Sequence, residues 1–341
     1  MDESAAVRLT KVIQMGLGPI GQRVVKDLAQ RSDFELVGVI DIDPKKVGQD
    51  AGLLSGTRSL GVEVQEEAQE VLSGDADLVF LTTGSSLASI ESQLTCCIQA
   101  DKSVISTCEE LAYAFDAQPS IASKIDRMAI EHQVVVLGTG VNPGFLMDAL
   151  PIFLSSVCRR VNSVRIERYQ DASIRRLPFQ QKIGAALTPD EFEVKRVAGQ
   201  IRHVGFTESI QLIGAALGWV LDRVEDRVEP VIARKNVVSQ YLSVDEGLCA
   251  GLRQVGYGYR NKDLVVSLEL QAYLGHPDPR DRVVIDGDPP IDSTIAGGVD
   301  GDVATSSMVL NTVSAISSAS PGLRTMVDIP LSHWRTSALG I

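Results

Sequence analysis

Residues 11–21 read Lys11-Val-Ile-Gln-Met-Gly16-Leu17-Gly18-Pro19-Ile20-Gly21, and they indicate the architecture of the whole N-terminal part of the chain. A short apolar run leads into the pattern G-x-G-x-x-G, an amphipathic segment follows, and a second apolar run ends at Asp41. In such a unit, Gly16 allows a tight turn, Gly18 lets the backbone approach a pyrophosphate, and Gly21 lets a helix pack closely on the strand. The free N–H groups at the helix start face the phosphates. The stretch therefore predicts a dinucleotide-binding βαβ unit.

The acid at the end of the second apolar run bears on the choice of cofactor. Asp41 lies 20 residues after Gly21, where an acidic side chain accepts hydrogen bonds from the adenosine ribose. Asp41 and Asp43 repel a 2′-phosphate and favour NAD, whereas Lys45 and Lys46 partly offset that repulsion. We expect NAD as the better cofactor, with NADP also accepted. The cofactor contacts expected from this unit are Gly16, Leu17, Gly18, Pro19, Ile20, Gly21, Asp41 and Ile42.

Length and composition narrow the class of protein. A chain of 341 residues with 44% hydrophobic residues can bury a large core and is expected to form two domains. Its net charge of −12 argues against a nucleic-acid partner, which needs a basic surface. The five cysteines and four histidines show no metal-site spacing, so free thiols and no metal are expected. Because neither a signal peptide nor an 18-residue apolar run is present, we expect a soluble cytoplasmic protein with no membrane partner.

Strand and helix patterns alternate through the first 140 residues, which predicts a parallel sheet covered by helices on both faces. Beyond about residue 160 the pattern changes. Residues 264–274 alternate between apolar and mostly polar side chains. Neighbouring β-like runs predict a mostly antiparallel or mixed sheet, and they span residues 163–171, 228–236, 237–244, 250–259 and 282–286. We expect α/β architecture: a doubly wound domain over residues 1–147, an α+β domain over 148–300, and a C-terminal helical segment, about 301–341, packing back on the first domain.

Ligands of an open parallel sheet lie at the carboxyl ends of its strands, which selects the loops 16–21, 41–46, 82–86 and 106–110. In the third loop, Thr82, Thr83, Gly84 and Ser85 are predicted to contact the cofactor, although a helix cap by Ser85 or Ser86 explains the same residue types. After a further strand ending at Leu137, Asn142 is predicted to cap a helix whose first residue is Pro143.

The loop 106–110 contains the strongest candidates for proton transfer. Glu109 and Glu110 follow a buried strand, and a partly desolvated carboxylate there can exchange protons with an amine or water. The alternative is that both acids only favour a helix start. Acylating aldehyde dehydrogenases use a cysteine nucleophile, which is one interpretation of Cys108. Such a thiol needs a base, and no histidine neighbours Cys108 in the sequence, so a packed thiol is the favoured interpretation.

The second domain offers polar and aromatic residues for a substrate. Residues 168–182 concentrate such groups and either line a substrate cleft or form a solvated strand and loop. An arginine there can pair with a carboxylate in bidentate geometry. His203 precedes a predicted helix start and is either a substrate contact or a structural histidine, and Thr305 follows a predicted cap at Asp302.

Several motifs together carry a family resemblance. Gly38-Val-Ile-Asp41-Ile42-Asp43-Pro44, Ser106-Thr-Cys108-Glu109-Glu110-Leu111 and Gly140-Val-Asn142-Pro143-Gly144-Phe145 resemble the 2,4-diaminopentanoate dehydrogenase family, which includes NAD(P)-dependent amine dehydrogenases. Residues 175–184 and 297–305 are also similar, so the resemblance covers nearly the whole chain. It implies a dihydrodipicolinate reductase-like architecture and a homodimer built through second-domain sheets.

The resemblance also implies an activity and its residues. It implies reversible oxidative deamination of an amine to a ketone or aldehyde plus ammonia, with Glu109 as the proton-handling group and Glu110 in reserve. We expect Cys108 and Asn142 to complete the cofactor site. The expected substrate contacts are Thr139, Arg176, Phe179, His203 and Thr305.

Other activities stay open at this stage. Dihydrodipicolinate reductases carry a His-His pair and a lysine before a Pro-Ser-Gly-Thr run, and this chain contains neither motif. The alternatives are 2,4-diaminopentanoate dehydrogenation itself, oxidoreduction of a semialdehyde, and NAD binding without turnover by a sensor or structural protein.

Overall fold

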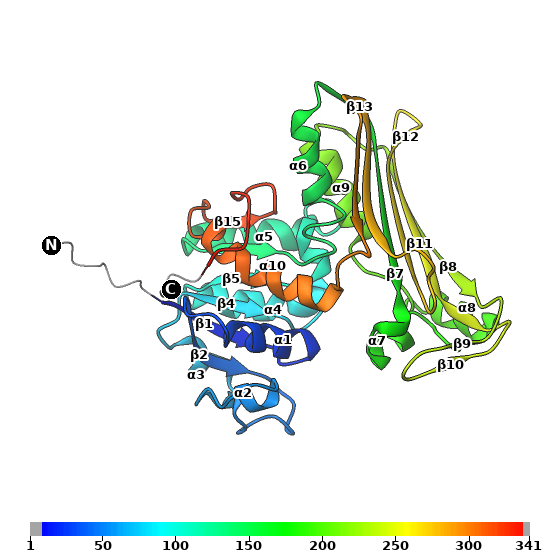
Figure 1. Ribbon diagram of the computed structural model, residues 1–341. Helices are drawn as coiled ribbons and strands as arrows, with labels where there is room; N and C mark the ends of the chain where they lie inside the picture. The colour runs from blue at the N-terminus through cyan, green and yellow to red at the C-terminus, as the bar shows by residue number, and fades with distance from the viewer. Residues whose placement is uncertain (1–8, 337–341) are drawn as a thin grey trace. The chain divides into compact units, whose positions relative to one another are not determined.

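The computed structural model describes residues 9–336 and contains two compact units. Unit 1 contains the chain up to Phe145 and again from Gly301, and unit 2 spans Leu146–Asp300 (Figure 1). Within the described residues, no helix combines the length and the apolar character needed to cross a bilayer.

Unit 1 contains a parallel sheet with the strand order β15-β6-β5-β4-β1-β2-β3. The order turns back between β1 and β4, which is the switch point where a doubly wound sheet binds its ligand. This confirms the predicted Rossmann-type architecture. The strands are β1 (Thr10–Met15), β2 (Phe34–Ile40), β3 (Val64–Gln65), β4 (Leu78–Leu81), β5 (Ser103–Ser106), β6 (Val135–Gly138) and β15 (Gly322–Arg324).

Helices cover both faces of this sheet, as the alternating pattern predicts. On one face α1 and α10 pack against each other, and Val25 and Leu310 share their core. On the other face α4 packs on α5, and Leu94 and Ile125 share a second core. The helices are α1 (Pro19–Leu28), α2 (Ala51–Leu54), α3 (Ala68–Leu72), α4 (Leu87–Gln99), the 3-10 helix η1 (Glu109–Tyr113), α5 (Pro119–Glu131) and α10 (Gly301–Ile316).

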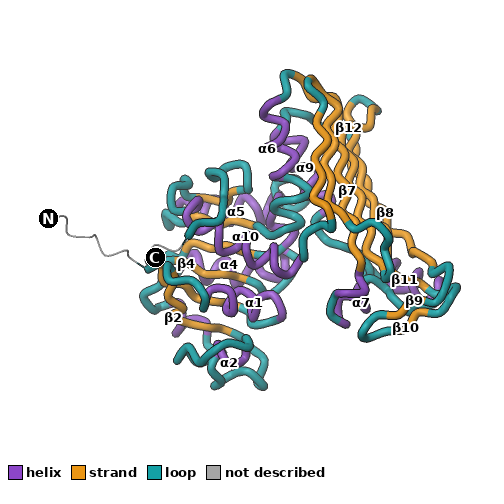
Figure 2. The backbone as a smooth tube through the Cα atoms, in the orientation of Figure 1, coloured by secondary structure: helices purple, strands orange, loops and turns teal. Residues whose placement is uncertain are grey.

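Unit 2 contains a mixed sheet with the strand order β14-β13-β7-β12-β11-β8, seen as long neighbouring strands in Figure 2. The pair β7 and β12 is parallel and the other neighbours are antiparallel, which confirms the predicted mixed sheet. The strands are β7 (Arg160–Asp171), β8 (Arg223–Ile232), β11 (Cys249–Arg260), β12 (Asp263–Tyr273), β13 (Arg280–Asp288) and β14 (Ile291–Ala296), and the hairpin strands are β9 (Val237–Val238) and β10 (Ser243–Val244).

One face of the unit 2 sheet forms the core of this unit. Helix α9 packs on β8, β11 and β12, and a Cβ added at Gly256 would lie 2.8 Å from Ile210 of that helix. Val266 and Leu268 are fully buried on this face. The helices of the unit are α6 (Ala149–Leu154), η2 (Ser155–Val157), η3 (Ala172–Ile174), α7 (Leu177–Lys182), α8 (Pro189–Val197) and α9 (Phe206–Ala216). Helix α8 begins with the capping box of Thr188 and Glu191 expected from the sequence.

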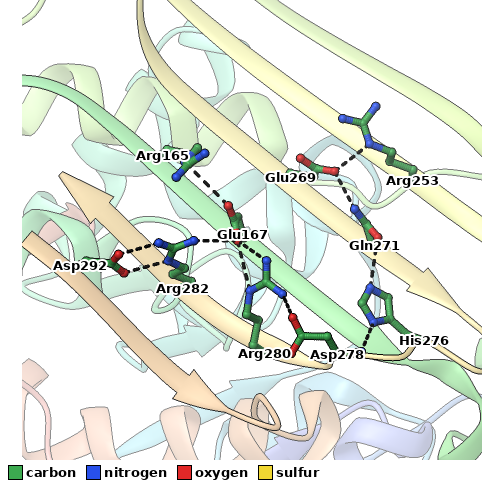
Figure 3. A network of polar contacts seen from close by, with 10 residues as sticks. All are labelled: Arg165, Glu167, Arg253, Glu269, Gln271, His276, Asp278, Arg280, Arg282 and Asp292. Atoms are coloured by element: carbon green, nitrogen blue, oxygen red, sulfur yellow. Dashed lines mark hydrogen bonds and ion pairs between the residues drawn. The ribbon is translucent and has the colours of Figure 1, made fainter. Parts of the chain in front are cut away.

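The opposite face of the same sheet is charged, because side chains alternate between the two faces along each strand. We call it the charged face, and its members include Arg165, Glu167, Arg253, Glu269, Arg280 and Arg282 (Figure 3). Glu167 and Glu269 are register partners on β7 and β12, so two carboxylates lie side by side. Arg280 pairs with Glu167 at 2.8 Å and Arg253 pairs with Glu269 at 2.7 Å, which compensates both charges.

The structure corrects several local predictions. Pro143 does not begin a helix. Gly144 has φ +118°, which an α-helix does not use, so the chain continues in turns and α6 begins at Ala149 with Asp148 as its cap. Residues 237–244 form the hairpin β9–β10 and not one strand, because Ser239 donates its N–H to the Leu242 carbonyl across a turn.

Short elements escaped the sequence analysis because they lack a full period of apolar residues. The C-terminal segment is not only helical: after α10 it returns as β15, which pairs with β6 in parallel. Asp126 of α5 accepts a 2.9 Å hydrogen bond from the Leu323 N–H of β15. The other elements missed are β3, β14, α2, α3 and α7.

Candidate active site

The three glycines at the carboxyl end of β1 differ in their surroundings, and each difference has a physical consequence. Gly16 has φ +90°, a conformation that a side chain disfavours, and its N–H donates to the Ile40 carbonyl. A Cβ on Gly21 would lie 2.0 Å from the Gly16 carbonyl oxygen, so only glycine lets α1 pack so close to the strand. No atom lies within 4 Å of a Cβ built on Gly18, so the backbone there is open to a ligand.

The side chains of Gln14 and Thr82 support this loop through hydrogen bonds. The amide Nε2 of Gln14 donates to the Gly16 carbonyl and to Thr82 Oγ1, both at 2.8 Å. Thr82 Oγ1 in turn donates to the Gly16 carbonyl at 2.9 Å. Thr82, a predicted cofactor contact, thus supports the glycine loop. Gln14 was not among the predicted site residues, although it is a polar residue inside the apolar run Val12-Ile13-Gln14-Met15, and its side chain is fully buried.

Asp41 follows β2 and reaches across to the glycine loop. Its Oδ2 accepts a 2.6 Å hydrogen bond from the Leu17 N–H, and its Oδ1 accepts one of 2.9 Å from the Asp43 N–H. Lys46 Nζ lies 3.1 Å from Oδ2. Burial raises the pKa of Asp41, but these hydrogen bonds and the Lys46 ammonium outweigh it and hold the pKa below its usual value. The neighbouring Ile42 is 79% exposed, an apolar surface beside the predicted adenosine site.

The loop after β4 is organised by a partner that lies far away in the sequence. Ser86 occupies the N-cap position of α4 without a capping side-chain hydrogen bond. Glu110 Oε2 instead accepts a 2.8 Å hydrogen bond from the Leu87 N–H in the first turn. The Ser85 carbonyl accepts the Glu110 N–H at 3.3 Å. The cap by Ser85 or Ser86 considered from the sequence is therefore wrong for Ser86, because a carboxylate at the positive helix end serves instead.

Further along this loop, Thr83 Oγ1 donates to Gln93 Oε1 of α4. Next to it, a Cβ on Gly84 would lie 3.2 Å from Ser89 Oγ. The backbone of the loop thus packs on the first turns of the helix that follows it.

The two glutamates after β5 have different surroundings. Glu110 Oε2 also accepts a 2.6 Å hydrogen bond from Gln118 Nε2, so its carboxylate joins η1 to α4 and to the start of α5. Glu109 is partly buried and begins η1 at the carboxyl end of β5. Proton transfer requires a carboxylate that can turn toward a substrate, and the contacts of Glu110 commit that side chain to the scaffold.

The cysteine beside these acids is a packed thiol. Cys108 is 1% exposed and lies in the apolar core with Leu111. Burial raises the pKa of the Cys108 thiol to about 12, so it is protonated at neutral pH. A thiol in this state is a poor nucleophile, which argues against chemistry through an acyl-enzyme.

The turn after β6 and the start of α10 lie together. Thr305 Oγ1 accepts a 3.3 Å hydrogen bond from the Val141 N–H, and a Cβ on Gly140 would lie 3.6 Å from Thr305 Cγ2. Thr139 is buried, and its hydroxyl contacts Met326 Sδ at 3.1 Å. Asn142 is 9% exposed in the same turn. The structure therefore brings Thr139, Asn142 and Thr305 into one neighbourhood of unit 1.

In unit 2, the run 168–182 is less solvated than a surface strand and loop would be. Arg168 is 3% exposed and pairs with the buried Asp281 at 3.1 Å. Burial lowers the pKa of Arg168 and raises the pKa of Asp281, while their mutual attraction opposes both shifts. Arg175 is also buried, lies 4.3 Å above the Phe179 ring and pairs with Asp300 at 3.7 Å. The interpretation as a solvated segment is therefore wrong for both arginines, because each is buried and forms an ion pair with an acidic residue distant in the sequence.

His203 and Arg176 are the remaining candidates of unit 2. The His203 backbone is clamped by the buried Gln254, which accepts the His203 N–H at 2.7 Å and donates to its carbonyl at 2.9 Å. Burial lowers the pKa of His203 to about 3, and the cations of Lys182 and Arg168 add to the shift. The ring is therefore neutral over the physiological pH range. Arg176 is partly exposed directly before α7.

The start of α1 has the features of a site for the phosphates of a dinucleotide. Gly18 is the N-cap of α1 and supplies no capping side chain, and no atom lies within 4 Å of a Cβ built on it, so this helix end is open to an anion. Within residues 9–336 no group of three or more His, Cys, Asp or Glu side chains is placed to hold a metal ion.

Comparison with known proteins tests the family resemblance. Residues 145–339 match the model of the 2,4-diaminopentanoate dehydrogenase C-terminal domain, and residues 10–110 match that of the dihydrodipicolinate reductase N-terminus. A 2,4-diaminopentanoate dehydrogenase from Acetoanaerobium sticklandii is 32% identical over 335 residues, which cover 94% of this chain and 93% of that protein. The chain belongs to the 2,4-diaminopentanoate dehydrogenase family. The resemblance seen in the motifs is confirmed, and with it the prediction of an oxidoreductase.

Two amine dehydrogenases are also similar to this chain. An amine dehydrogenase from Streptomyces virginiae is 22% identical over 95% of this chain and 97% of that protein. The solved structure of an amine dehydrogenase from Mycobacterium smegmatis covers 96% of this chain and 97% of its own, with a TM-score of 0.83 at 21% identity. That likeness confirms the fold of both units.

Proposed function

We propose that this member of the 2,4-diaminopentanoate dehydrogenase family is an NAD(P)-dependent amine dehydrogenase. It catalyses reversible oxidative deamination of an amine to a ketone or aldehyde plus ammonia, and reductive amination in reverse. The match over 94% of the chain to a 2,4-diaminopentanoate dehydrogenase carries the proposal. Within the proposal, the hydrogen bonds that Glu110 accepts from Leu87 and Gln118 give that residue a structural role.

The cofactor site proposed here uses the backbone of residues 16–21 for the pyrophosphate and Asp41 with Ile42 for the adenosine. Gly84, Ser85 and Asn142 are the further contacts proposed, and Thr82, Thr83 and Cys108 support the loops from which those contacts come. When bound, the nicotinamide accepts hydride from the amine-bearing carbon, or returns it in the reverse direction. We propose NAD as the better cofactor, with NADP also accepted.

Glu109 is the proposed proton-handling residue. An amine gives up hydride only as its neutral form, so the carboxylate of Glu109 first takes a proton from the ammonium. Glu109 passes this proton to solvent water before hydride transfer, and the regenerated carboxylate stabilises the cationic iminium that develops on the substrate. As a general base, Glu109 then activates the water that attacks the imine carbon. One partly buried carboxylate thus serves both the deprotonation and the hydrolysis.

The substrate proposed is a small amine or, in reverse, a carbonyl compound with ammonia. The proposed substrate contacts are Thr139, Arg176, Phe179, His203 and Thr305. A neutral His203 offers a hydrogen bond without adding charge, whereas Arg176 suits a substrate carboxylate. A carboxylated diamine is favoured by the name of the relative from Acetoanaerobium sticklandii.

The charged face is the proposed dimer interface. It presents paired charges and the partly buried Tyr257, whose ring lies 6.4 Å from that of Tyr259. We expect Tyr257→Glu to shift the protein from dimer to monomer in sedimentation velocity. Tyr241→Glu, at a 47% exposed site on the β9–β10 hairpin, is the matched control and keeps the dimer. A wild-type monomer contradicts the interface.

A cytoplasmic location is proposed as well, because five free thiols suit a reducing compartment.

A substrate panel tests the proposed activity. Carbonyl compounds, with and without a carboxylate, are incubated with NADH and ammonia, and the matching amines with NAD. We expect ammonia-dependent oxidation of NADH and amine-dependent reduction of NAD. Oxidation of NADH by a carbonyl compound without any need for ammonia would instead support an alcohol-forming reductase.

Substitution of the two glutamates tests the residue assignment. We expect Glu109→Gln to lower kcat by roughly 10²-fold or more, because it removes the proton acceptor, while NADH affinity stays nearly unchanged. Glu110→Gln keeps a hydrogen-bond acceptor for Leu87 and should retain kcat within about tenfold, with a lower unfolding midpoint. An inactive Glu110→Gln beside a normally active Glu109→Gln would assign the role to Glu110.

A further inference from the structure

Asp41 has a structural role in addition to the predicted contact with a ribose. Its carboxylate joins the end of β2 to the glycine loop through the 2.6 Å hydrogen bond from the Leu17 N–H. It also closes the turn after β2 by accepting the Asp43 N–H at 2.9 Å. The side chain is 10% exposed. Asp41 therefore stays in place whichever cofactor approaches, because two backbone donors hold both of its oxygens.

These contacts leave little capacity for a ribose diol. A carboxylate offers about four acceptor positions, two on each oxygen. The Leu17 N–H and the Lys46 ammonium occupy Oδ2, and the Asp43 N–H occupies one position of Oδ1. One position on Oδ1 remains, which suits a single ribose hydroxyl. The acid therefore selects for the 2′-hydroxyl less strongly than a carboxylate with both oxygens available.

The charge of Asp41 is also compensated, and by one particular lysine. Lys46 Nζ lies 3.1 Å from Asp41 Oδ2 and 3.6 Å from Asp43 Oδ2, and the side chain is 21% exposed. The adjacent Lys45 is exposed and touches Asp43 only through its backbone N–H. Its ammonium has no ion-pair partner within residues 9–336. The two lysines have the same expected role in the sequence analysis but differ in their contacts in the structure.

We propose that Lys46, and not Lys45, determines how well the site accepts a 2′-phosphorylated adenosine. An ammonium has three donors, so Lys46 can contact Asp41 and a phosphate oxygen together and lower the repulsion between these two anions. Asp41 does not move, because Leu17 and Asp43 keep hold of it. The inference rests on the nucleotide site of the proposed function and not on its amine chemistry.

Direct binding of NADH and NADPH, which differ only in the 2′-phosphate, tests this inference by titration of the nicotinamide fluorescence without any substrate. The variants are Lys46→Met and the matched control Lys45→Met. We expect Lys46→Met to raise the Kd for NADPH at least tenfold more than the Kd for NADH. Lys45→Met should change the ratio of the two constants less than threefold. Asp41→Asn, which keeps an acceptor for Leu17 but removes the charge, should shift the ratio toward NADPH.

The outcomes separate this inference from the proposed activity. An equal change of both constants in Lys46→Met, or a larger change of the ratio in Lys45→Met, would overturn the role of Lys46. Failure of wild-type protein to bind either dinucleotide would overturn the inference together with the nucleotide site. A protein that binds both cofactors with the expected ratios but oxidises no amine would retain the inference and lose the proposed activity.

Discussion

The glycine loop of unit 1 and the charged face of unit 2 represent two ways of placing polar groups in a fold. In the loop, Gly16, Gly18 and Gly21 act through backbone groups or through the side chain they lack, and the Gln14 amide supports them with a hydrogen bond to the Gly16 carbonyl. On the charged face, side chains act, and Glu167 is held by Arg280 and Arg282 from the neighbouring strand. Substitutions should therefore fail for different reasons in the two regions.

In the loop the constraint is short-range and steric, and on the charged face it is long-range and electrostatic. A missing Cβ is visible in any sequence, whereas an arginine's partner depends on which strands pair and in which register. The charged face thus tolerates rearrangement as long as charges balance, while the loop has no room for an added atom at Gly16 or Gly21.

The largest effect is expected from Gly21→Ala. The new Cβ would lie 2.0 Å from the Gly16 carbonyl oxygen, so α1 must move away from the strand. We expect the free energy of unfolding to fall by about 1–3 kcal/mol or more, as for other overpacked sites, and NADH affinity to fall at least about 10²-fold, or about 2.7 kcal/mol. Urea unfolding and fluorescence titration measure the two effects.

Gly18→Ala is the matched control in the same loop. Its Cβ meets no atom within 4 Å, so the unfolding free energy should stay unchanged while NADH binding weakens, because the methyl group enters the space that the pyrophosphate needs. Equal destabilisation by both substitutions would show that the loop is not organised by the Gly16–Gly21 contact.

A smaller effect is expected on the charged face from Glu167→Gln. The side chain is 7% exposed, and the substitution removes the negative charge that Arg165, Arg280 and Arg282 all contact. We expect the free energy of unfolding to fall by roughly 1–3 kcal/mol. Glu193→Gln, which breaks an exposed pair with Arg196 on α8, is the control and should cause no measurable change. A stable Glu167→Gln variant would mean that the arginines find other partners.

The smallest effect is a pH dependence assigned to His203. Its pKa falls from 6.5 to about 3 on folding because of burial, so the folded state resists protonation while the unfolded chain accepts it. Stability from this residue is complete above pH 6.5 and is lost as the pH falls toward 3. Between pH 7 and pH 5 we expect a loss of up to about 2 kcal/mol, at 1.36 kcal/mol per pH unit.

The replacement His203→Gln, which does not titrate, isolates this contribution. Urea unfolding of both proteins at pH 7 and pH 5 should show a smaller loss of stability in the variant. Identical losses would assign the pH dependence to other groups.

The sequence by itself determined the nucleotide loop, the acid after β2, the doubly wound class of unit 1 and the family of the chain. These features depend on glycine positions, apolar periodicity and motif order, all of which act over short separations in the sequence. The tertiary structure decided the roles of individual polar residues. Glu110 has a structural role because it contacts Leu87, 23 residues away, and Gln14 has one because it contacts Thr82, 68 residues away. Arg168 and Asp281, 113 residues apart, became a buried pair in the same way. A hydrogen bond or an ion pair depends on distance in space, and only the packing of strands and helices brings such distant residues together.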